Sequence, residues 1–238
     1  MKRAIIVGAS SGIGRELAKV LSQDGYTLGL TGRRLELLSS LREEVPTASV
    51  IRQMDVSHTA QAMQQLEELI QEIGGVDLLI ISAGIGFINP ELEWEKEEST
   101  LGTNVSGFAA IANVALKHFI GQSSGHLVGI SSIAALRGSG AAPAYNASKA
   151  FVSNYMEGLR QKVSKLKLPI IITDIKPGFV DTAMAKGEGL FWLAPPEKAA
   201  RQIYDAIKKR KSGATITKRW RVIAWLFKVL PDRIYNKI

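Results

Sequence analysis

Short runs of apolar residues recur along the chain, and stretches with helical periodicity separate them. The runs contain few polar positions, which is typical of strands buried on both faces of a parallel sheet. We expect strands at residues 4–7, 27–31, 49–53, 78–82, 127–131 and 170–175, with a last one at 214–217. Strands that alternate with helices predict an α/β fold, here a single-domain, Rossmann-type, doubly wound parallel sheet with helices on both faces.

Two of the intervening helices have ends that the sequence marks. One covers about residues 13–23 and stops at Gly25, since glycine readily ends a helix. A second begins at Ser57, a good N-cap residue, and ends at the pair Gly74 and Gly75.

The composition narrows the class of protein. The 238 residues are 46% hydrophobic and contain no low-complexity linker, which fits one compact domain. There is no cysteine, so disulfides and thiolate chemistry are excluded and a reducing cytoplasm is the expected location. Because His58, His118 and His126 have no ligand-like spacing, we expect no metal site. No apolar run is long enough for a signal peptide or a spanning helix.

Positive charge is concentrated near the C-terminus. Residues 198–238 hold 12 Lys and Arg against 2 Asp and Glu, whereas the residues before them hold 18 against 20. We expect residues 1–217 to form the main domain and residues 218–238 to be a basic, apolar extension packed on or beside it. The extension could lie on an anionic membrane, cover a pocket or pack at a subunit interface, and we favour the last two. No recognisable nucleic-acid-binding module accompanies the basic residues.

A glycine-rich loop follows the first expected strand directly and opens the first expected helix. Glycine there permits a tight turn, close approach of the backbone to a pyrophosphate and close packing of the helix on the sheet. The amides at the helix N-terminus can then hold the anion. A plain strand-to-helix turn is the alternative, but the strand–loop–helix order favours a dinucleotide site. The residues expected to contact the cofactor are Gly8, Ser10, Ser11, Gly12, Ile13 and Gly14.

Two arginines stand where a dinucleotide fold often carries the acid that grips the adenosine ribose. The second expected strand ends near Gly32, and Arg33 and Arg34 follow it. Such a pair can bind the 2′-phosphate of NADP through charge-assisted hydrogen bonds, although solvated arginines at a helix start are the alternative. We therefore expect NADP(H) as the cofactor, with Arg33 as the first contact and Arg34 as the second.

A tyrosine and a lysine, Tyr145 and Lys149, stand four residues apart and therefore on one face of a helix. A neighbouring ammonium lowers the pKa of a phenol, so Lys149 could make Tyr145 an acid–base group at neutral pH. Ser132 lies thirteen residues before Tyr145, at the end of an expected strand, where its hydroxyl could orient a substrate oxygen. No Gly-x-Ser-x-Gly elbow surrounds Ser132, which disfavours a hydrolase nucleophile.

Together these motifs resemble the short-chain dehydrogenase/reductase family over about residues 3–215. The glycine loop is similar to the family's cofactor fingerprint, and Ser132, Tyr145 and Lys149 fall at its catalytic spacing. The resemblance implies that Asn104 is a fourth catalytic residue, which helps to position a water in the proton relay to Lys149. It also implies that residues 1–217 form an NADP-binding catalytic domain.

The resemblance implies further cofactor contacts. Where the family usually reads Asn-Asn-Ala-Gly, this chain has Ile-Ser-Ala-Gly, so the usual asparagine hydrogen bonds are reduced to those that Ser82 can make. Residues 183–194 look like the family's substrate lid, or else like a connector packed on the core. The implied contacts are Asp55 and Val56 at the adenine, Ser82, Ala83 and Gly84 after the fourth strand, and Pro177, Gly178, Val180 and Thr182 near the nicotinamide. Tyr145 and Lys149 are implied to contact the cofactor as well, with Lys149 holding the ribose.

The implied function is an NADP(H)-dependent oxidoreductase that interconverts a carbonyl and an alcohol, with Tyr145 exchanging the proton. The substrate would be a small molecule. The apolar residues at 190–193 and 220–230 favour an apolar one. A non-catalytic NADP-binding redox sensor is the alternative from another class, and an epimerase or dehydratase has no positive support. The resemblance implies a homodimer or homotetramer, although core packing would explain the apolar spacing of Phe151, Tyr155, Met156 and Leu159 equally well.

Overall fold

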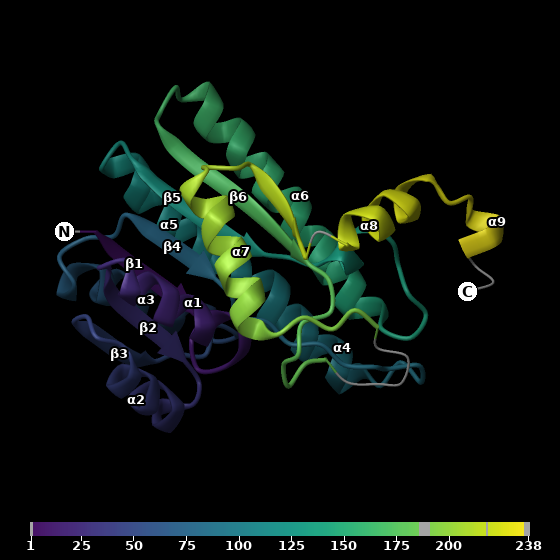
Figure 1. The fold of residues 1–238 in the computed structure, drawn as a ribbon, viewed down its shortest axis with the longest axis horizontal. Coiled ribbons are helices and arrows are strands. Elements are labelled where there is room, and N and C mark those ends of the chain that lie inside the picture. The colour runs from purple at the N-terminus through teal and green to yellow at the C-terminus, as the bar shows by residue number, and fades with distance from the viewer. Residues whose placement is uncertain (1, 186–190, 218, 236–238) are drawn as a thin grey trace.

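The architecture is one seven-stranded sheet between two layers of helices (Figure 1). A computed structural model describes residues 2–185, 191–217 and 219–235. All neighbouring strands are parallel, in the order β3-β2-β1-β4-β5-β6-β7. The strands are β1 (Arg3–Val7), β2 (Thr27–Gly32), β3 (Ser49–Gln53), β4 (Leu78–Ile81), β5 (Gly125–Ile130), β6 (Ile170–Pro177) and β7 (Gly213–Ile216).

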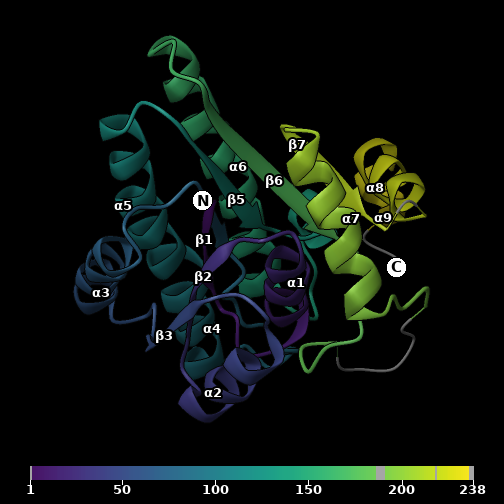
Figure 2. The ribbon, with the colours of Figure 1, turned by 60° about the vertical axis from the view of Figure 1, so that its left-hand side comes forward.

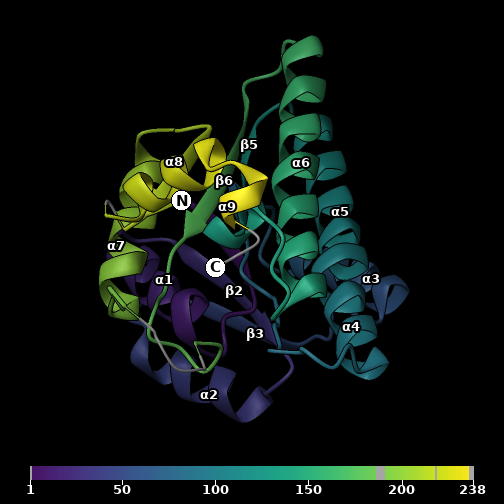
Figure 3. The same ribbon diagram turned by 90° about the vertical axis from the view of Figure 1, so that its right-hand side faces the viewer.

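Helices cover both faces of the sheet, as the turned views show (Figures 2 and 3). One layer contains α1, α2 and α7, and the other contains α3, α5 and α6. The helices are α1 (Gly12–Gln23), α2 (Leu35–Glu44), α3 (Thr59–Glu72), α4 (Trp94–Leu101), α5 (Phe108–Gly121), α6 (Pro143–Lys165), α7 (Pro196–Lys208), α8 (Trp220–Val229) and α9 (Asp232–Tyr235), with a π-helical turn η1 (Gly102–Gly107) and a 3₁₀ turn η2 (Ile133–Leu136).

Strand β1 shows why the apolar runs are continuous. Successive side chains of a strand point to opposite faces, so Ile5 and Val7 enter the core beneath α3, α5 and α6, while Ala4 and Ile6 enter the core beneath α1, α2 and α7. All four are almost completely buried. The fold class expected from the sequence, a doubly wound parallel sheet, is therefore confirmed.

The expected element ends are mostly close to the observed ones. Helix α1 ends at Gln23 as expected, and Gly25 has the positive φ of 79° that favours glycine. The N-cap assigned to Ser57 is wrong, because α3 starts two residues later, with His58 at the cap position. Ser57 instead donates two hydrogen bonds to Oδ1 of Asp55, from its amide at 3.0 Å and from its hydroxyl at 2.8 Å.

The strand order reverses between β1 and β4, and the loops after these two strands meet there. The amides of Ser82 and Ala83 both donate to the carbonyl of Val7, each at 2.8 Å. Open parallel sheets bind their ligands at the carboxyl ends of the strands beside such a reversal. This edge of the sheet is consequently the expected place of a ligand site.

The C-terminal helices α8 and α9 lie at the edge of the molecule beyond β7 (Figure 1). Across the described ranges, none of the helices is both long and apolar enough to cross a membrane.

Candidate active site

The glycine loop is built so that side chains would not fit at two of its glycines. Gly8 has a φ of 91°, and a Cβ there would lie 2.4 Å from the amide nitrogen of Ala83. A Cβ on Gly14 would lie 2.1 Å from the carbonyl oxygen of Gly8. Gly8 therefore packs by backbone contact on the loop after β4, and the start of α1 packs by backbone contact on Gly8, as a dinucleotide fingerprint requires.

The start of α1 has the features of an anion site. Ser11 occupies the N-cap position without a side-chain hydrogen bond to the helix, which leaves the first amides for another partner. Thr182 comes from the loop after β6 to cover Gly12, where a Cβ would be 3.0 Å from Cγ2 of Thr182. This cradle of glycine backbone and helix amides fits a pyrophosphate.

The two arginines after β2 point to different partners. Nη2 of Arg34 donates to the hydroxyls of Ser10 and Ser11, at 3.1 and 2.7 Å, and so reaches across the glycine loop. Arg33 lies near Asp55. Partial burial acts to raise the pKa of the Asp55 carboxyl, but the hydrogen bonds from Ser57 and the positive charge of Arg33 lower it. The structure thus places Arg34, the second choice from the sequence, against the loop.

The expected adenine-side residues lie next to these arginines. Val56 is buried and packs on the π-helical turn, since a Cβ on Gly107 would be 2.7 Å from the Val56 carbonyl oxygen. Gln53, at the end of β3, donates from Nε2 to the carbonyl of Arg33 at 2.8 Å. Strands β2 and β3 together hold this side of the site.

Tyr145 and Lys149 both project from α6 on one face. Nζ of Lys149 lies 5.8 Å from the centroid of the Tyr145 ring and donates to the carbonyl of Ile130 at 3.1 Å. Burial lowers the pKa of Lys149 to about 8, and the negative charge of Asp174 acts in the opposite direction. The ammonium is therefore held beside the phenol in a buried position, with only 5% of the residue exposed.

Ser132 follows β5 and faces Tyr145. Its Oγ accepts a hydrogen bond of 3.1 Å from the amide of Ala134, at the start of the turn η2. Burial raises the pKa of Tyr145, and a hydrogen bond shared with Ser132 lowers it in part. In this structure burial has the larger effect on the pKa of Tyr145, and Nζ of Lys149 donates to the carbonyl of Ile130.

Asn104 lies in the π-helical turn η1 between α4 and α5, a distortion that often marks functional sites. Its side chain clamps the peptide of Ile85: Oδ1 accepts from the Ile85 amide at 2.9 Å, and Nδ2 donates to the Ile85 carbonyl at 2.7 Å. Nδ2 also donates to Oγ of Ser148 at 3.0 Å. Asn104 thus joins the loop after β4 to the helix that carries Lys149.

Two glycines in the loop after β4 allow this close approach. A Cβ on Gly84 would lie 3.2 Å from Nζ of Lys149 and 3.3 Å from Oδ1 of Asn104. A Cβ on Gly86 would lie 2.6 Å from the ring of Tyr145. Gly84 is among the residues expected from the sequence and Gly86 is not, although the spacing of the two glycines was a visible signal.

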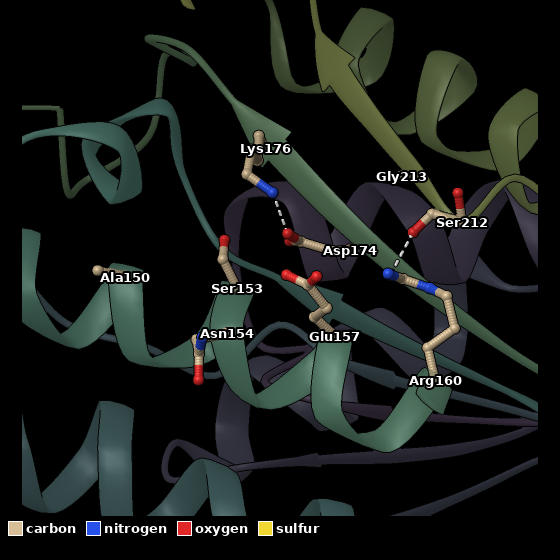
Figure 4. A pocket seen from close by; sticks show the side chains of 9 residues that line it. All are labelled: Ala150, Ser153, Asn154, Glu157, Arg160, Asp174, Lys176, Ser212 and Gly213. Carbon is tan, nitrogen blue, oxygen red and sulfur yellow. Dashed lines mark hydrogen bonds and ion pairs between the residues drawn. The ribbon is translucent and has the colours of Figure 1, made fainter. Parts of the chain in front are cut away.

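Asp174 is a second residue that the sequence analysis missed. It is 4% exposed on β6, accepts a hydrogen bond from the hydroxyl of Ser131 and pairs with Lys176. Figure 4 shows the pair beside a cavity of about 390 Å³ between α6 and the sheet edge, lined by Ala150, Ser153, Asn154, Glu157, Arg160, Asp174, Lys176, Ser212 and Gly213. The signal was an aspartate that follows the apolar run of residues 170–172 and lies two residues before Lys176 on the same strand.

The segment expected near the nicotinamide is packed by the C-terminal helix. The ring of Trp220 fills the place of a side chain on Gly178, where a Cβ would be 2.2 Å from the indole. Pro177 ends β6, and Val180 forms an isolated bridge with Ala194. Trp220 is 1% exposed, so α8 belongs to the packing of this loop.

The expected lid falls partly outside the described residues, because residues 186–190, including Leu190, are not among them. Phe191 and Trp192 lie 5.1 and 6.0 Å from Trp220 between ring centroids, and both remain partly exposed. The described end of this segment is therefore tied to the C-terminal helix.

The face of α6 considered for a subunit contact belongs largely to the core. Met156 and Leu159 are buried. The rings of Phe151 and Tyr155 stack on each other, with 5.3 Å between their centroids, and pack against the same core. Core packing therefore explains this apolar spacing within the chain.

The histidines do not form a metal site in the part of the chain that the structure describes, where no suitable cluster of His, Cys, Asp or Glu occurs. His126 is buried beside Thr173, with 2.8 Å between Nε2 and Oγ1, and burial lowers its pKa to about 4.

Comparison with known proteins agrees with this geometry. The chain matches the short chain dehydrogenase family over residues 2–190. It is 34% identical to an uncharacterized oxidoreductase of Myxococcus xanthus, over 99% of this chain and 95% of that one. The chain belongs to the short-chain dehydrogenase family of oxidoreductases.

Two solved structures are similar in fold. The structure of ElxO with NADP bound has a TM-score of 0.73 and 25% identity, over 86% of this chain and 90% of that one. A short-chain dehydrogenase/reductase from Burkholderia phymatum in complex with NAD has a TM-score of 0.85 and 23% identity, over 94% and 92%.

Proposed function

We propose that this protein is an NADP(H)-dependent enzyme that interconverts a carbonyl group and an alcohol of a small molecule. The observation that carries the proposal is the meeting of three side chains: the hydroxyl of Ser132 lies close enough to Tyr145 to lower the pKa of its phenol, and the ammonium of Lys149 lies beside the ring of Tyr145. A phenol between a hydroxyl and an ammonium suits proton exchange at a substrate oxygen.

The residues at the other end of the site fit a nicotinamide dinucleotide. The pyrophosphate would lie against Gly8, Gly12 and the first amides of α1, which lack a side-chain cap. Such a cofactor supplies or accepts the hydride when it is bound. Arg34, across the glycine loop, supports NADP over NAD because its guanidinium can bind a 2′-phosphate, and Arg33 would add positive charge. ElxO, which is similar in structure, binds NADP.

The chain's own groups would divide the acid–base work. Since burial raises the pKa of Tyr145, its phenol is protonated at neutral pH and is ready to donate to a carbonyl oxygen, the reductive direction. Ser132 would hold that oxygen by a hydrogen bond. Lys149 would stabilise the negative charge left on Tyr145, and Asn104 holds the backbone of Ile85 in place.

The test is consumption of NADPH, measured with a panel of aldehydes and ketones and repeated with NADH. We expect turnover with NADPH on at least one carbonyl, and the Tyr145→Phe variant should lose about 10²- to 10⁴-fold in kcat while it still binds NADPH. A Tyr145→Phe enzyme with unchanged kcat would refute the role of the phenol. Tight binding of NADPH with no turnover on any carbonyl would instead favour a redox sensor.

A further inference from the structure

Helix α8 has two apolar faces, and only one of them is covered. Trp220 and Ala224 are buried against the body of the molecule, while Ile223 and Phe227 are partly buried. The opposite face carries Val222, Trp225, Leu226 and Val229, which are 65%, 64%, 40% and 52% exposed. Their spacing of three, four and seven residues places these four side chains in one stripe, called here the outer stripe.

The helix is held firmly with the outer stripe turned outward. Arg137, in the loop after η2, donates to the carbonyl of Leu230 at 3.0 Å and to Oδ1 of Asp232 at 2.7 Å. The hydroxyl of Tyr235 donates to the carbonyl of Gly138. These contacts fix both ends of the segment, since Trp220 is buried at its start, and Figure 3 shows α8 and α9 lying across this side of the molecule.

The charge around α8 is of one sign. Between Asp205 and Asp232 the sequence contains eight Lys and Arg residues and no Asp or Glu. Arg219 and Arg221 are exposed at the start of the helix, and Asp232 is paired with Arg137. A second copy of the chain on the outer stripe would bring these positive charges together, whereas an anionic surface would neutralise them.

The dimensions fit a helix that lies in a lipid surface. Ten residues of helix span about 15 Å, which is too short to cross a bilayer of about 30 Å. A stripe of Val, Leu and Trp flanked by arginine is the composition of an interfacial helix, because tryptophan favours the headgroup region and basic residues attract anionic lipid. At the N-terminal end of α8, Phe191 and Trp192 add exposed apolar surface beside Trp220.

We propose that the protein docks on an anionic membrane surface through the outer stripe of α8, with Arg219 and Arg221 facing the lipid headgroups. Docking would place the loop of residues 191–195, and hence the candidate active site, next to the membrane. The covered face of α8 packs on Gly178, and the outer stripe gives the same helix a second contact.

The experiment is co-sedimentation of the full chain with vesicles of phosphatidylcholine alone and of phosphatidylcholine mixed with phosphatidylglycerol. We expect binding to the mixed vesicles, weak binding to the neutral ones, and release as salt is raised, since salt screens the attraction. The double variant Trp225→Ser/Leu226→Ser should bind the mixed vesicles about tenfold more weakly, because two large apolar side chains no longer enter the lipid.

A matched control separates this stripe from exposed tryptophan in general. Trp94 on α4 is 62% exposed, almost the same as Trp225, so Trp94→Ser should bind like the unchanged protein. Circular dichroism melting would verify that the variants are folded. Absence of vesicle binding, or an equal loss in Trp94→Ser, would overturn the proposal. So would a dimer in analytical ultracentrifugation that only the double variant abolishes, because the outer stripe would then bind a second copy.

Discussion

Nδ2 of Asn104 donates a hydrogen bond of 3.0 Å to Oγ of Ser148, the residue directly before Lys149 in α6. The hydroxyl of Ser148 in turn donates to the carbonyl of Tyr145 at 2.8 Å. One buried amide, 1% exposed, therefore connects the π-helical turn to the helical turn that carries the phenol and the ammonium.

Replacing Asn104 should affect both stability and turnover. In Asn104→Ala the amide and carbonyl of Ile85 lose their side-chain partners, and unsatisfied buried polar groups cost about 1–3 kcal/mol each. We expect the free energy of unfolding to fall by about 2–4 kcal/mol. Ser148→Ala leaves the Ile85 clamp in place and removes the hydrogen bonds of the Ser148 hydroxyl to Asn104 and to the carbonyl of Tyr145, so it should cost less, about 1–2 kcal/mol. Urea denaturation measures both, and equal losses would show that the Ile85 clamp is unimportant.

The two arginines should differ in their effect on the cofactor. Arg34→Ala should raise the Kd for NADPH by about 10- to 100-fold, because a charge-assisted hydrogen bond to phosphate contributes about 1.5–3 kcal/mol. The Kd for NADH should change little, since NADH lacks the 2′-phosphate. Arg33→Ala should have the smaller effect, because Arg34 is the arginine that contacts Ser10 and Ser11. Titration by nicotinamide fluorescence gives these values; a larger loss in Arg33→Ala would reverse the assignment.

The deprotonation of Lys149 should set the loss of activity on the alkaline side (the alkaline limb) of the pH–rate profile. Because burial lowers its pKa to about 8, kcat/KM should fall as the pH rises through about 8 and the ammonium loses its proton. Asp174→Asn removes the negative charge that raises this pKa, so the limb should move to lower pH. Steady-state rates across this pH range are the measurement. A limb that stays in place in Asp174→Asn would exclude electrostatic coupling of the two residues.

The buried ammonium of Lys149 should also lower the free energy of unfolding. Between about pH 8 and pH 10.4 the unfolded chain keeps the Lys149 proton that the folded chain has lost, so this group makes stability rise with pH in that window. Below about pH 8 the cost of burying the ammonium is fully present. Lys149→Met should therefore be inactive yet raise the free energy of unfolding at neutral pH by about 1–3 kcal/mol. A destabilised Lys149→Met would show that the bond to Ile130 outweighs the burial cost.

The fold could be predicted because it depends on local patterns. A strand covered by helices on both faces needs apolar residues at consecutive positions, and Ile5 and Ile6 enter opposite cores for this reason. The pairing of Tyr145 and Lys149 could be predicted in the same way, since their spacing on one helix fixes their proximity. Ser132 was found because a strand end marks the functional edge of a parallel sheet.

Other parts of the site depend on contacts between distant segments, which no local pattern encodes. The choice between Arg33 and Arg34 depends on how the chain turns after β2 toward Ser10. The packing of Trp220 on Gly178 depends on the path of the whole segment after β7. The pKa of Tyr145 depends on how completely the site is buried, and the spacing to Lys149 contains no information about burial.

Two glycine substitutions should have opposite effects on stability. Gly14→Ala should lower the free energy of unfolding by at least about 2 kcal/mol, because its Cβ would collide with the rigid backbone of Gly8. Gly158, in the interior of α6, has nothing within 4 Å of a built Cβ, so Gly158→Ala should raise it by about 0.5–1 kcal/mol. Thermal melting compares the two, and a neutral Gly14→Ala would contradict the close packing of the loop.

The position of Trp220 on Gly178 also has a consequence for the order of assembly. Trp220 follows all seven strands in the chain, so the indole that packs on Gly178 is synthesised after every strand of the sheet and after the glycine loop. Until that indole arrives, the loop after β6 has an empty space the size of a bicyclic ring at its base. The loop after β6 thus obtains its final packing from a residue that is made after all the strands of the sheet.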